Sequence, residues 1–493
     1  MARKTWLTAG LAFGAVAGCA GQPTVIRQLP AGAVVAAEVQ AGAKAETPEQ
    51  KASALLRSGF ARIDAGDLDG ALADFDAAVK AAPGYANAYA VRGGCRVLKG
   101  DFPGAEEDFR VAIREDYACH LAYHNRGYMH WKRKRFDLAV ADYSSAIQYF
   151  RPGADAADND DVVYYQNRGI AYEDMGDLDR AQLDFGTCIA RAPRNPAFLQ
   201  NRALVFVRKR LYEQALADLD ASLALAPEDA QAWCNRGFAS RALGDVDRAV
   251  RDYTRALQAR PDYAQALVGR GHSYLELEAY PKATTDFNAA LAADAHCAAA
   301  RLGLGQMHLA QGRLDDALKQ FRHAVELDGG SATAQHNIGV VLAQQGKRED
   351  ALAHLLRACE LDQQQIRHWT AYGLACLDMQ RWDAAAVAFN RALELDAHDF
   401  RARQGRARAF KGRKDWVLAE ADTARNLELF PDHIAARLDA ARLSGARGDR
   451  PACLRHLKAA IDLGLENAAD LCGDPDFAGL RDDPEFKRLL EGK

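Results

Sequence analysis

One pattern constrains this chain more than any other: most of its 493 residues belong to a sequence that repeats with a period of 34. Twelve copies follow one another, and they begin at Ala52, Ala86, His120, Val162, Pro196, Ala230, Ala264, Ala298, Ala332, Ile366, Phe400 and Ile434. The one irregular interval holds an insert, residues 154–161, between the third and fourth copies. A short repeated unit cannot bury its apolar face alone, so neighbouring copies must stack into one continuous core.

Three positions within the period predict that each copy is a pair of closely packed helices. The eighth position is glycine in nine copies and alanine in the other three, and the twentieth is alanine in eleven. The twenty-fourth is aromatic in most copies. Small residues let two helix backbones approach, and the aromatic side chain fills the remaining space. Glycines such as Gly100 mark the turn between the helices, and prolines such as Pro83 end the second helix.

The period and these positions resemble the tetratricopeptide repeat, a pair of antiparallel helices. The resemblance spans residues 47–467 and implies an all-α fold, a right-handed α-solenoid of twelve helix pairs. Residues 468–493 are expected to form a short helical cap, since an acid and a proline precede apolar residues at Asp474 and again at Asp483. Solenoids need such a cap to cover the exposed face of the last repeat.

The first residues predict an export signal and a lipid anchor. Arg3 and Lys4 precede an apolar run that is too short to span a bilayer. The run ends in Val-Ala-Gly before Cys19, which resembles the bacterial lipobox. This resemblance implies that residues 1–18 are removed and that Cys19 is acylated, with Ala20 favouring the outer membrane and the folded part facing the periplasm. The alternative is ordinary signal cleavage, which leaves a soluble protein.

Residues 19–46 are predicted to be a flexible tether. They are rich in alanine, glycine and valine, contain two prolines and have no helical period. Folding is expected to begin at Thr47, where the sequence Thr-Pro-Glu-Gln forms a helix capping box with proline at the first helical position.

Two positions of the repeat vary together and predict an ion pair between the two helices of a copy. Seven copies have arginine at position seven and aspartate at position twenty-three: Arg92 with Asp108, Arg126 with Asp142, Arg168 with Asp184, Arg202 with Asp218, Arg236 with Asp252, Arg270 with Asp286, and Arg406 with Asp422. Copies eight, nine, ten and twelve lose both residues, and only the first is mismatched, with Ser58 and Asp74. Joint loss is expected of a shielded pair, because one partner alone is a stranded charge. The alternative is simple inheritance of blocks during duplication.

The sixth position predicts a groove that binds peptide. It carries a run of asparagines, namely Asn125, Asn167, Asn201, Asn235 and Asn337. The array resembles the asparagine ladder of the O-GlcNAc transferase repeats, without the catalytic domain, and the resemblance implies that it lies along the inner groove. An asparagine amide offers a donor and an acceptor to one peptide unit of an extended chain. The alternative is that these asparagines only solvate the groove.

A second binding feature is expected in the eleventh copy, where residues 401–414 hold seven basic residues and no acid. On the repeat template Arg401, Arg408 and Lys411 face the groove. Such a stripe is predicted to receive an acidic partner segment or a carboxylate terminus.

Composition and motifs argue against other classes of function. A net charge of -4 does not fit a nucleic-acid binder, which usually carries a strongly basic face. The ten cysteines lack regular ligand spacing, so no metal site is expected, and no nucleophile elbow, phosphate loop or dinucleotide fingerprint predicts an enzyme or a cofactor.

The sequence therefore predicts a membrane-anchored scaffold that binds protein partners through extended segments and does no chemistry of its own. One alternative is a soluble periplasmic or secreted regulatory subunit of a separately encoded enzyme. Another is a scaffold that assembles with itself, although the polar cap opposes end-to-end stacking.

Overall fold

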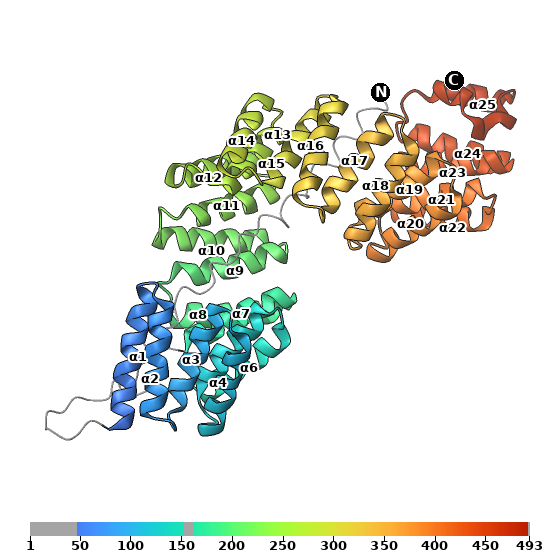
Figure 1. The fold of residues 1–493 in the computed structure, drawn as a ribbon. Helices are drawn as coiled ribbons and strands as arrows, with labels where there is room; N and C mark the ends of the chain where they lie inside the picture. The colour runs from blue at the N-terminus through green and yellow to red at the C-terminus, as the bar shows by residue number, and fades with distance from the viewer. Residues whose placement is uncertain (1–46, 152–160, 492–493) are drawn as a thin grey trace. The chain divides into compact units, whose positions relative to one another are not determined.

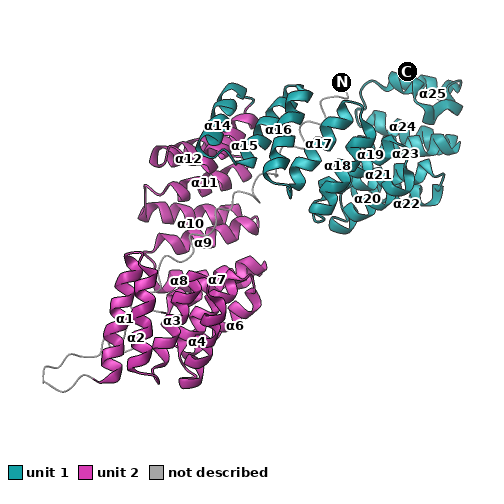
Figure 2. Ribbon diagram, viewed as in Figure 1, with its two compact units in different colours: residues 1–19, 278–493 teal, residues 20–277 magenta. Residues whose placement is uncertain are grey.

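A computed structural model describes residues 47–151 and 161–491. The predicted signal sequence, Cys19, the tether and all but the last residue of the insert lie outside these ranges. The described residues divide into two compact units, which meet along the chain after Leu277 and are coloured separately in Figure 2. We call them the N-terminal unit and the C-terminal unit. Each is described by itself.

The N-terminal unit is a series of antiparallel helices stacked side by side in chain order (Figure 1). Its helices are α1 (Pro48–Asp64), α2 (Leu68–Ala81), α3 (Ala86–Lys99), α4 (Phe102–Glu115), α5 (His120–Lys132), α6 (Phe136–Tyr149), α7 (Val162–Met175), α8 (Leu178–Arg191), α9 (Pro196–Arg208), α10 (Tyr212–Leu225), α11 (Ala230–Ala242), α12 (Val246–Ala259) and α13 (Ala264–Glu276).

The C-terminal unit continues the same arrangement and ends in two short 3-10 helices and a final α-helix. Its helices are α14 (Tyr280–Ala293), α15 (Ala298–Ala310), α16 (Leu314–Leu327), α17 (Ala332–Gln344), α18 (Arg348–Leu361), α19 (Ile366–Asp378), α20 (Trp382–Leu395), α21 (Phe400–Gly412), α22 (Trp416–Leu429), α23 (Ile434–Arg447), α24 (Arg450–Asp462), η1 (Ala468–Gly473), η2 (Pro475–Leu480) and α25 (Pro484–Glu491).

The predicted all-α solenoid is confirmed: across the described ranges the regular structure is helical throughout, and consecutive helices pack as antiparallel pairs. Odd-numbered helices from α1 to α23 are the first helices of the repeats, and even-numbered helices to α24 are the second. In every copy except the first, the first helix begins at the residue where the sequence period begins. Helix α1 begins earlier, at Pro48, with the predicted capping box of Thr47 and Gln50 present.

In most repeats the core is an aromatic ring that packs directly on a glycine. Phe109 at position twenty-four has no exposed surface, and a Cβ added to Gly93 at position eight would lie 2.6 Å from its ring. The same clash meets Gly305 against Phe321, at 2.4 Å. Since real Cβ atoms essentially never approach so closely, the small residue is what lets the ring lie between the two helices.

The turn between the two helices has one conformation in all twelve repeats. Position fifteen adopts a positive φ in each, with glycine in seven copies and Lys134, Arg210, Glu278, Gln380 and Lys414 in the others. A left-handed residue ends the first helix by satisfying its last carbonyl groups, and only glycine does so without a steric penalty from Cβ.

The cap keeps the period of the repeats although it does not keep their helices. Helix η1 begins at Ala468, where a thirteenth first helix would begin, and α25 begins at Pro484, where its second helix would begin. Pro475 interrupts the stretch between them, because proline lacks the backbone donor that a continuous helix needs. Phe477 and Phe486 are fully buried there and close the core over the last repeat.

The turn supplies a test that isolates backbone strain from packing. Gly244→Ala is expected to lower the free energy of unfolding by ~1 kcal/mol, because alanine is disfavoured at a positive φ. A Cβ there has no neighbour within 4 Å, so no packing term enters. Arg210→Gly is expected to shift stability in the opposite direction. Urea midpoints followed by circular dichroism measure both.

Gly84→Ala is the matched control, since its added Cβ also meets nothing within 4 Å and its φ lies outside the positive range. It should leave the midpoint unchanged or raise it slightly. Equal losses for Gly84→Ala and Gly244→Ala would contradict the strain argument.

Candidate partner-binding site

Six of the predicted ion pairs lie within single units, and all six form. The shortest arginine-to-aspartate contacts are Arg92–Asp108 2.6 Å, Arg126–Asp142 2.6 Å, Arg168–Asp184 2.8 Å, Arg202–Asp218 2.7 Å, Arg236–Asp252 2.6 Å and Arg406–Asp422 2.5 Å. In each pair Nε and Nη2 donate to the two carboxylate oxygens, which is the bidentate geometry that favours arginine over lysine. Arg270 and Asp286 belong to different units, so their pairing stays a prediction.

The aspartates of these pairs are buried, so each carboxylate needs a positively charged partner within the protein. Asp108 and Asp252 are each 2% exposed. Burial raises the pKa of Asp108, while the hydrogen bond and charge of Arg92 act to lower it. Removing the arginine therefore leaves a buried carboxylate without its bidentate partner, although Asp108 keeps a second donor, Arg96, at 2.8 Å.

The mismatched first copy uses a different cation for the same purpose. Ser58 donates to Asp74 at 2.7 Å, and Arg62, one helical turn further along, donates to the same carboxylate at 2.9 Å. The sequence comparison at position seven alone missed this substitution, although an arginine one turn away was visible.

A third contact of the arginines links neighbouring repeats. The free Nη1 reaches position twenty-five of the preceding copy in five cases: Arg92 to Asp76, Arg168 to Ser144, Arg236 to Asp220, Arg270 to Thr254, and Arg406 to Asn390. In front of Arg126 and Arg202 that position holds Arg110 and Gly186, which offer no side-chain acceptor. The guanidinium thus joins two helices of one repeat and, where chemistry allows, the helix before them.

The asparagines of position six do not share one environment, and two of them do not face an open groove. Asn125 is 2% exposed and donates to the carbonyl of Ala90 in the preceding repeat. Asn167 is 4% exposed, and its Nδ2 lies 2.8 Å from Nε2 of His124. The expectation that these two line a peptide groove is therefore corrected: both are used inside the protein.

The reason is that position six faces the preceding repeat. Where it is glycine, the aromatic ring of that repeat fills the space: a Cβ on Gly303 would lie 2.3 Å from Phe287. Asn201, Asn235 and Asn337 are partly exposed, and the buried Nδ2 atoms of Asn235 and Asn337 have no hydrogen-bond partner in the structure. A ligand role for these three stays a prediction.

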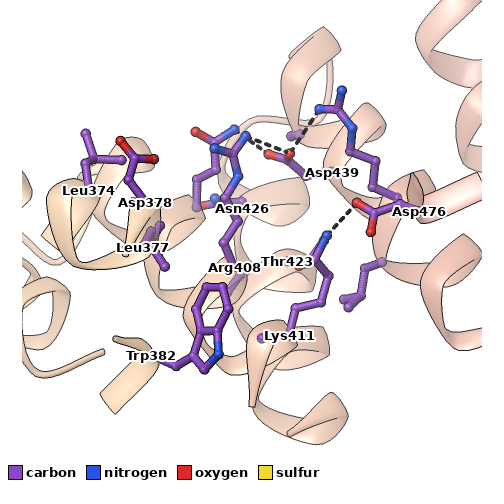
Figure 3. A pocket seen from close by; sticks show the side chains of 16 residues that line it. Leu374, Leu377, Asp378, Trp382, Arg408, Lys411, Thr423, Asn426, Asp439 and Asp476 are labelled. Atoms are coloured by element: carbon purple, nitrogen blue, oxygen red, sulfur yellow. Dashed lines mark hydrogen bonds and ion pairs between the residues drawn. The ribbon is translucent and has the colours of Figure 1, made fainter. Parts of the chain in front are cut away.

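The basic stripe of the eleventh repeat borders a pocket of ≈ 450 Å³ on the first helices of the last three repeats (Figure 3). Arg408 and Lys411 on α21 contribute to its wall, together with Leu374 and Leu377 on α19 and Trp382 at the start of α20. Helix α23 and the cap complete the lining, which also includes Gln404, Asn426, Asp439, Arg442 and Asp476.

The sequence-predicted cations of this stripe are engaged to different degrees. Lys411 forms an ion pair with Asp476 at 2.5 Å. Arg408 is 47% exposed along its side chain and has one carboxylate near it, Asp439 at 3.8 Å, which is beyond hydrogen-bond distance. Arg401 is exposed. Arg401 and Arg408 therefore keep most of their donors available for a ligand.

Asp439 is the buried carboxylate of the pocket. Gln404 donates to it at 2.5 Å, and Arg442 lies 4.0 Å away. Burial raises the pKa of Asp439, opposed by the hydrogen bond from Gln404 and by Arg408 and Arg442. The sequence did not predict Asp439, Trp382 or Asp476 as site residues, because their roles depend on which helices and turns come together.

Other chemistry has little support within the described ranges. No group of three or more histidine, cysteine, aspartate or glutamate side chains is placed to hold a metal ion among these residues. The nine described cysteines are thiols and not disulfides, and burial raises the pKa of the Cys188 thiol to about 12. None of the described helices has the length and hydropathy needed to cross a bilayer.

Comparison with known proteins gives a family match. A model described as Tetratricopeptide repeat matches residues 56–116, 99–158, 167–230, 269–332 and 309–366, which together exceed half of the chain. A second model with the same description matches residues 230–263. Among curated proteins, none matches the chain.

Solved structures match the chain at low sequence identity. A tetratricopeptide repeat protein from Parabacteroides merdae is 20% identical, with a TM-score of 0.42, over 50% of this chain and 98% of that one. The APC/C hetero-tetramer Cut9-Hcn1 is 15% identical, with a TM-score of 0.40, over 80% and 96%. Pseudomonas aeruginosa pilF is 19% identical, with a TM-score of 0.38, over 43% and 96%.

A double-mutant cycle tests the buried ion pair. Arg236→Ala should lower the free energy of unfolding by ~3 kcal/mol, because it strands the buried carboxylate of Asp252. Asp252→Ala should cost less, because Arg236 keeps its ion pair with Asp220. The double variant should lose much less than the sum, with a coupling energy of ~2 kcal/mol. Chemical denaturation of the four proteins supplies the values.

The exposed pair Arg425–Glu428 on α22 is the control, and its coupling should be below ~0.5 kcal/mol. Additive losses at Arg236 and Asp252 would contradict a shielded pair and leave inheritance of blocks as the reason for the covariation.

Proposed function

The chain belongs to the tetratricopeptide repeat family, and from that premise we propose that it is a non-enzymatic scaffold held at the bacterial envelope by a lipid on Cys19. It binds an extended segment of a partner protein along the inner side of its repeats. The proposed location is the outer membrane, with the repeats facing the periplasm, and the proposed role is to assist the assembly of envelope machinery. Repeats of this family generally mediate contacts between proteins.

The observation that carries the binding proposal is the pocket of the C-terminal unit. It lies across three consecutive first helices, so a segment that enters it meets side chains from three repeats. Arg408 in its wall, and the exposed Arg401 about two turns earlier on α21 and outside the lining, supply guanidinium donors that the protein itself uses little. Leu374, Leu377 and Trp382 supply apolar surface beside them. Apolar walls with a few polar groups are typical of specific binding pockets.

The anchor rests on different support, the sequence that ends in Cys19. An acylated N-terminal cysteine carries several chains, and two or more chains hold a protein stably at a membrane where one does not. The alternative is a soluble periplasmic or secreted regulatory subunit of a separately encoded enzyme, which needs no lipid.

Charge reversal tests whether the pocket recruits a partner. Arg401→Glu with Arg408→Glu should abolish capture of at least one protein by crosslinking in envelope extract, since both donors become repulsive toward an acidic segment. Quantitative mass spectrometry of the captured proteins provides the readout, after circular dichroism shows unchanged helix content.

The matched control reverses the same number of charges on second helices, with Arg391→Glu and Arg425→Glu. Both arginines are more than half exposed and pair only with a neighbour on their own helix, at Glu394 and Glu428. If the control variant loses the same proteins as the pocket variant, the pocket is not the binding site.

The anchor has its own test. Cys19→Ser should move the protein from the membrane pellet to the soluble fraction, because no thiol remains to accept a lipid. Intact mass of the wild-type protein should include diacylglycerol on Cys19. An unmodified mass, with cleavage elsewhere, would favour the soluble alternative.

A further inference from the structure

The cap places one of its carboxylates inside the pocket. Lys411 and Asp476 are 65 residues apart in sequence, yet their charged groups are 2.5 Å apart, and Figure 3 shows them pointing toward each other. Helix η2 packs on α23 of the last repeat. Its Asp476 reaches past that helix to α21, one repeat further into the groove.

The break at Pro475 is what allows this reach. A regular first helix contacts the first helix of its neighbour, as α21 contacts α19 and α23. In the cap the chain turns twice in short 3-10 segments, and Asp474 caps the second of them by accepting from the backbone of Asp476. The carboxylate of Asp476 then extends toward Lys411.

We propose that Asp476 occupies a carboxylate-binding position of the pocket and that an acidic residue of the partner segment displaces it there. This inference rests on the proposed function and adds to it the chemistry of the partner, an acidic residue flanked by apolar ones. It also adds a competitor, because Asp476, which has the same charge as the proposed occupant, already pairs with Lys411.

Charge balance supports an acidic occupant. The cap neutralises two of the three pocket cations, since Asp476 pairs with Lys411 and Asp474 pairs with Arg442 at 2.8 Å. When Asp476 leaves, Lys411 loses its carboxylate partner, and the lining keeps three cations, Arg408, Lys411 and Arg442, against two anions, Asp378 and Asp439. Only another anion restores the balance.

The partial exposure of the Lys411–Asp476 ion pair supports the replacement of Asp476 by a carboxylate of the partner. The side chains of Lys411 and Asp476 are 27% and 19% exposed, so an incoming carboxylate can approach the ammonium group from solvent. The structural pair of Arg236 and Asp252 differs in this respect, because its aspartate side chain is only 3% exposed. Leu374 and Trp382 line other parts of the same pocket and suit apolar residues of a segment that carries the acid.

Fluorescence anisotropy on the full chain tests the proposal with two probes. The first is the fluorescein-labelled peptide Gly-Leu-Asp-Leu-Glu-Leu-Gly, and the second is its counterpart with Asn and Gln in place of Asp and Glu. Asp476→Asn should tighten binding of the acidic probe about five-fold at low salt, because a competing part-buried ion pair is removed. Binding of the neutral probe should not change. Lys411→Gln should abolish the preference for the acidic probe.

Asp482→Asn is the matched control, since it removes the same charge from the cap at a fully exposed position whose salt-bridge partner is Lys487. If Asp482→Asn tightens the acidic probe as much as Asp476→Asn, the effect is general electrostatics and the competitor role is wrong. If wild type and Asp476→Asn bind both probes equally, the acidic occupant is wrong. Loss of a captured partner on charge reversal of Arg401 and Arg408 would still support the scaffold in either case.

Discussion

The fit of one aromatic ring against glycine governs the rest of this structure. The ring at position twenty-four lies on position eight of its own repeat and, where the chain allows it, on position six of the next. Phe389 does both, because a Cβ on Gly373 would lie 2.8 Å from it and one on Gly405 would lie 2.3 Å from it. A single side chain thus sets the distance between two helices of a repeat and between two repeats. Each first helix is thereby held in line to form one face of the groove.

The ion pairs depend on that spacing, and their covariation follows from it. The arginine and aspartate reach each other only because the helices are close, and the aspartate is then shielded from water. Where both are lost, the arginine position holds a buried apolar residue in three of the four copies, as with Leu304 and Ile338, which are 5% and 1% exposed. In the four copies that lose the pair, the aspartate position holds Gln320, His354, Ala388 or His456, so neither position carries a permanent charge. The site accepts a complete pair or no permanent charge, and half a pair is the costly state. Twelve copies in one chain were enough to display this rule.

The fold and the pairs were therefore predictable from sequence, whereas the pocket was not. Periodic features average over many copies, so the helix starts, the small positions and the arginine–aspartate pairs were all readable. The orientation of the side chain at position six was not predictable. A repeat template does not distinguish a side chain that faces the groove from one that packs against the neighbouring repeat. Asn125 packs against the neighbouring repeat, where its amide donates a hydrogen bond to the carbonyl of Ala90. Trp382, Asp439 and Asp476 are not part of the repeat pattern. Each of them lines the pocket through contacts that the other repeats do not share.

The position of the pocket at the last repeats follows from the break in the period. In the middle of the array a first helix has identical neighbours on both sides, and its charges are met by repeated partners. After α24 the short helices η1 and η2 stand where the period would place a thirteenth first helix. The side chains that the cap directs toward the preceding first helices are therefore not those of the repeat pattern. Asp474 and Asp476 bring charge to Arg442 and Lys411, but nothing brings comparable charge to Arg408. A solenoid that is capped by an irregular segment has at that end a stretch of surface whose contacts are made once, so selection can shape them without changing the contacts shared by the other repeats.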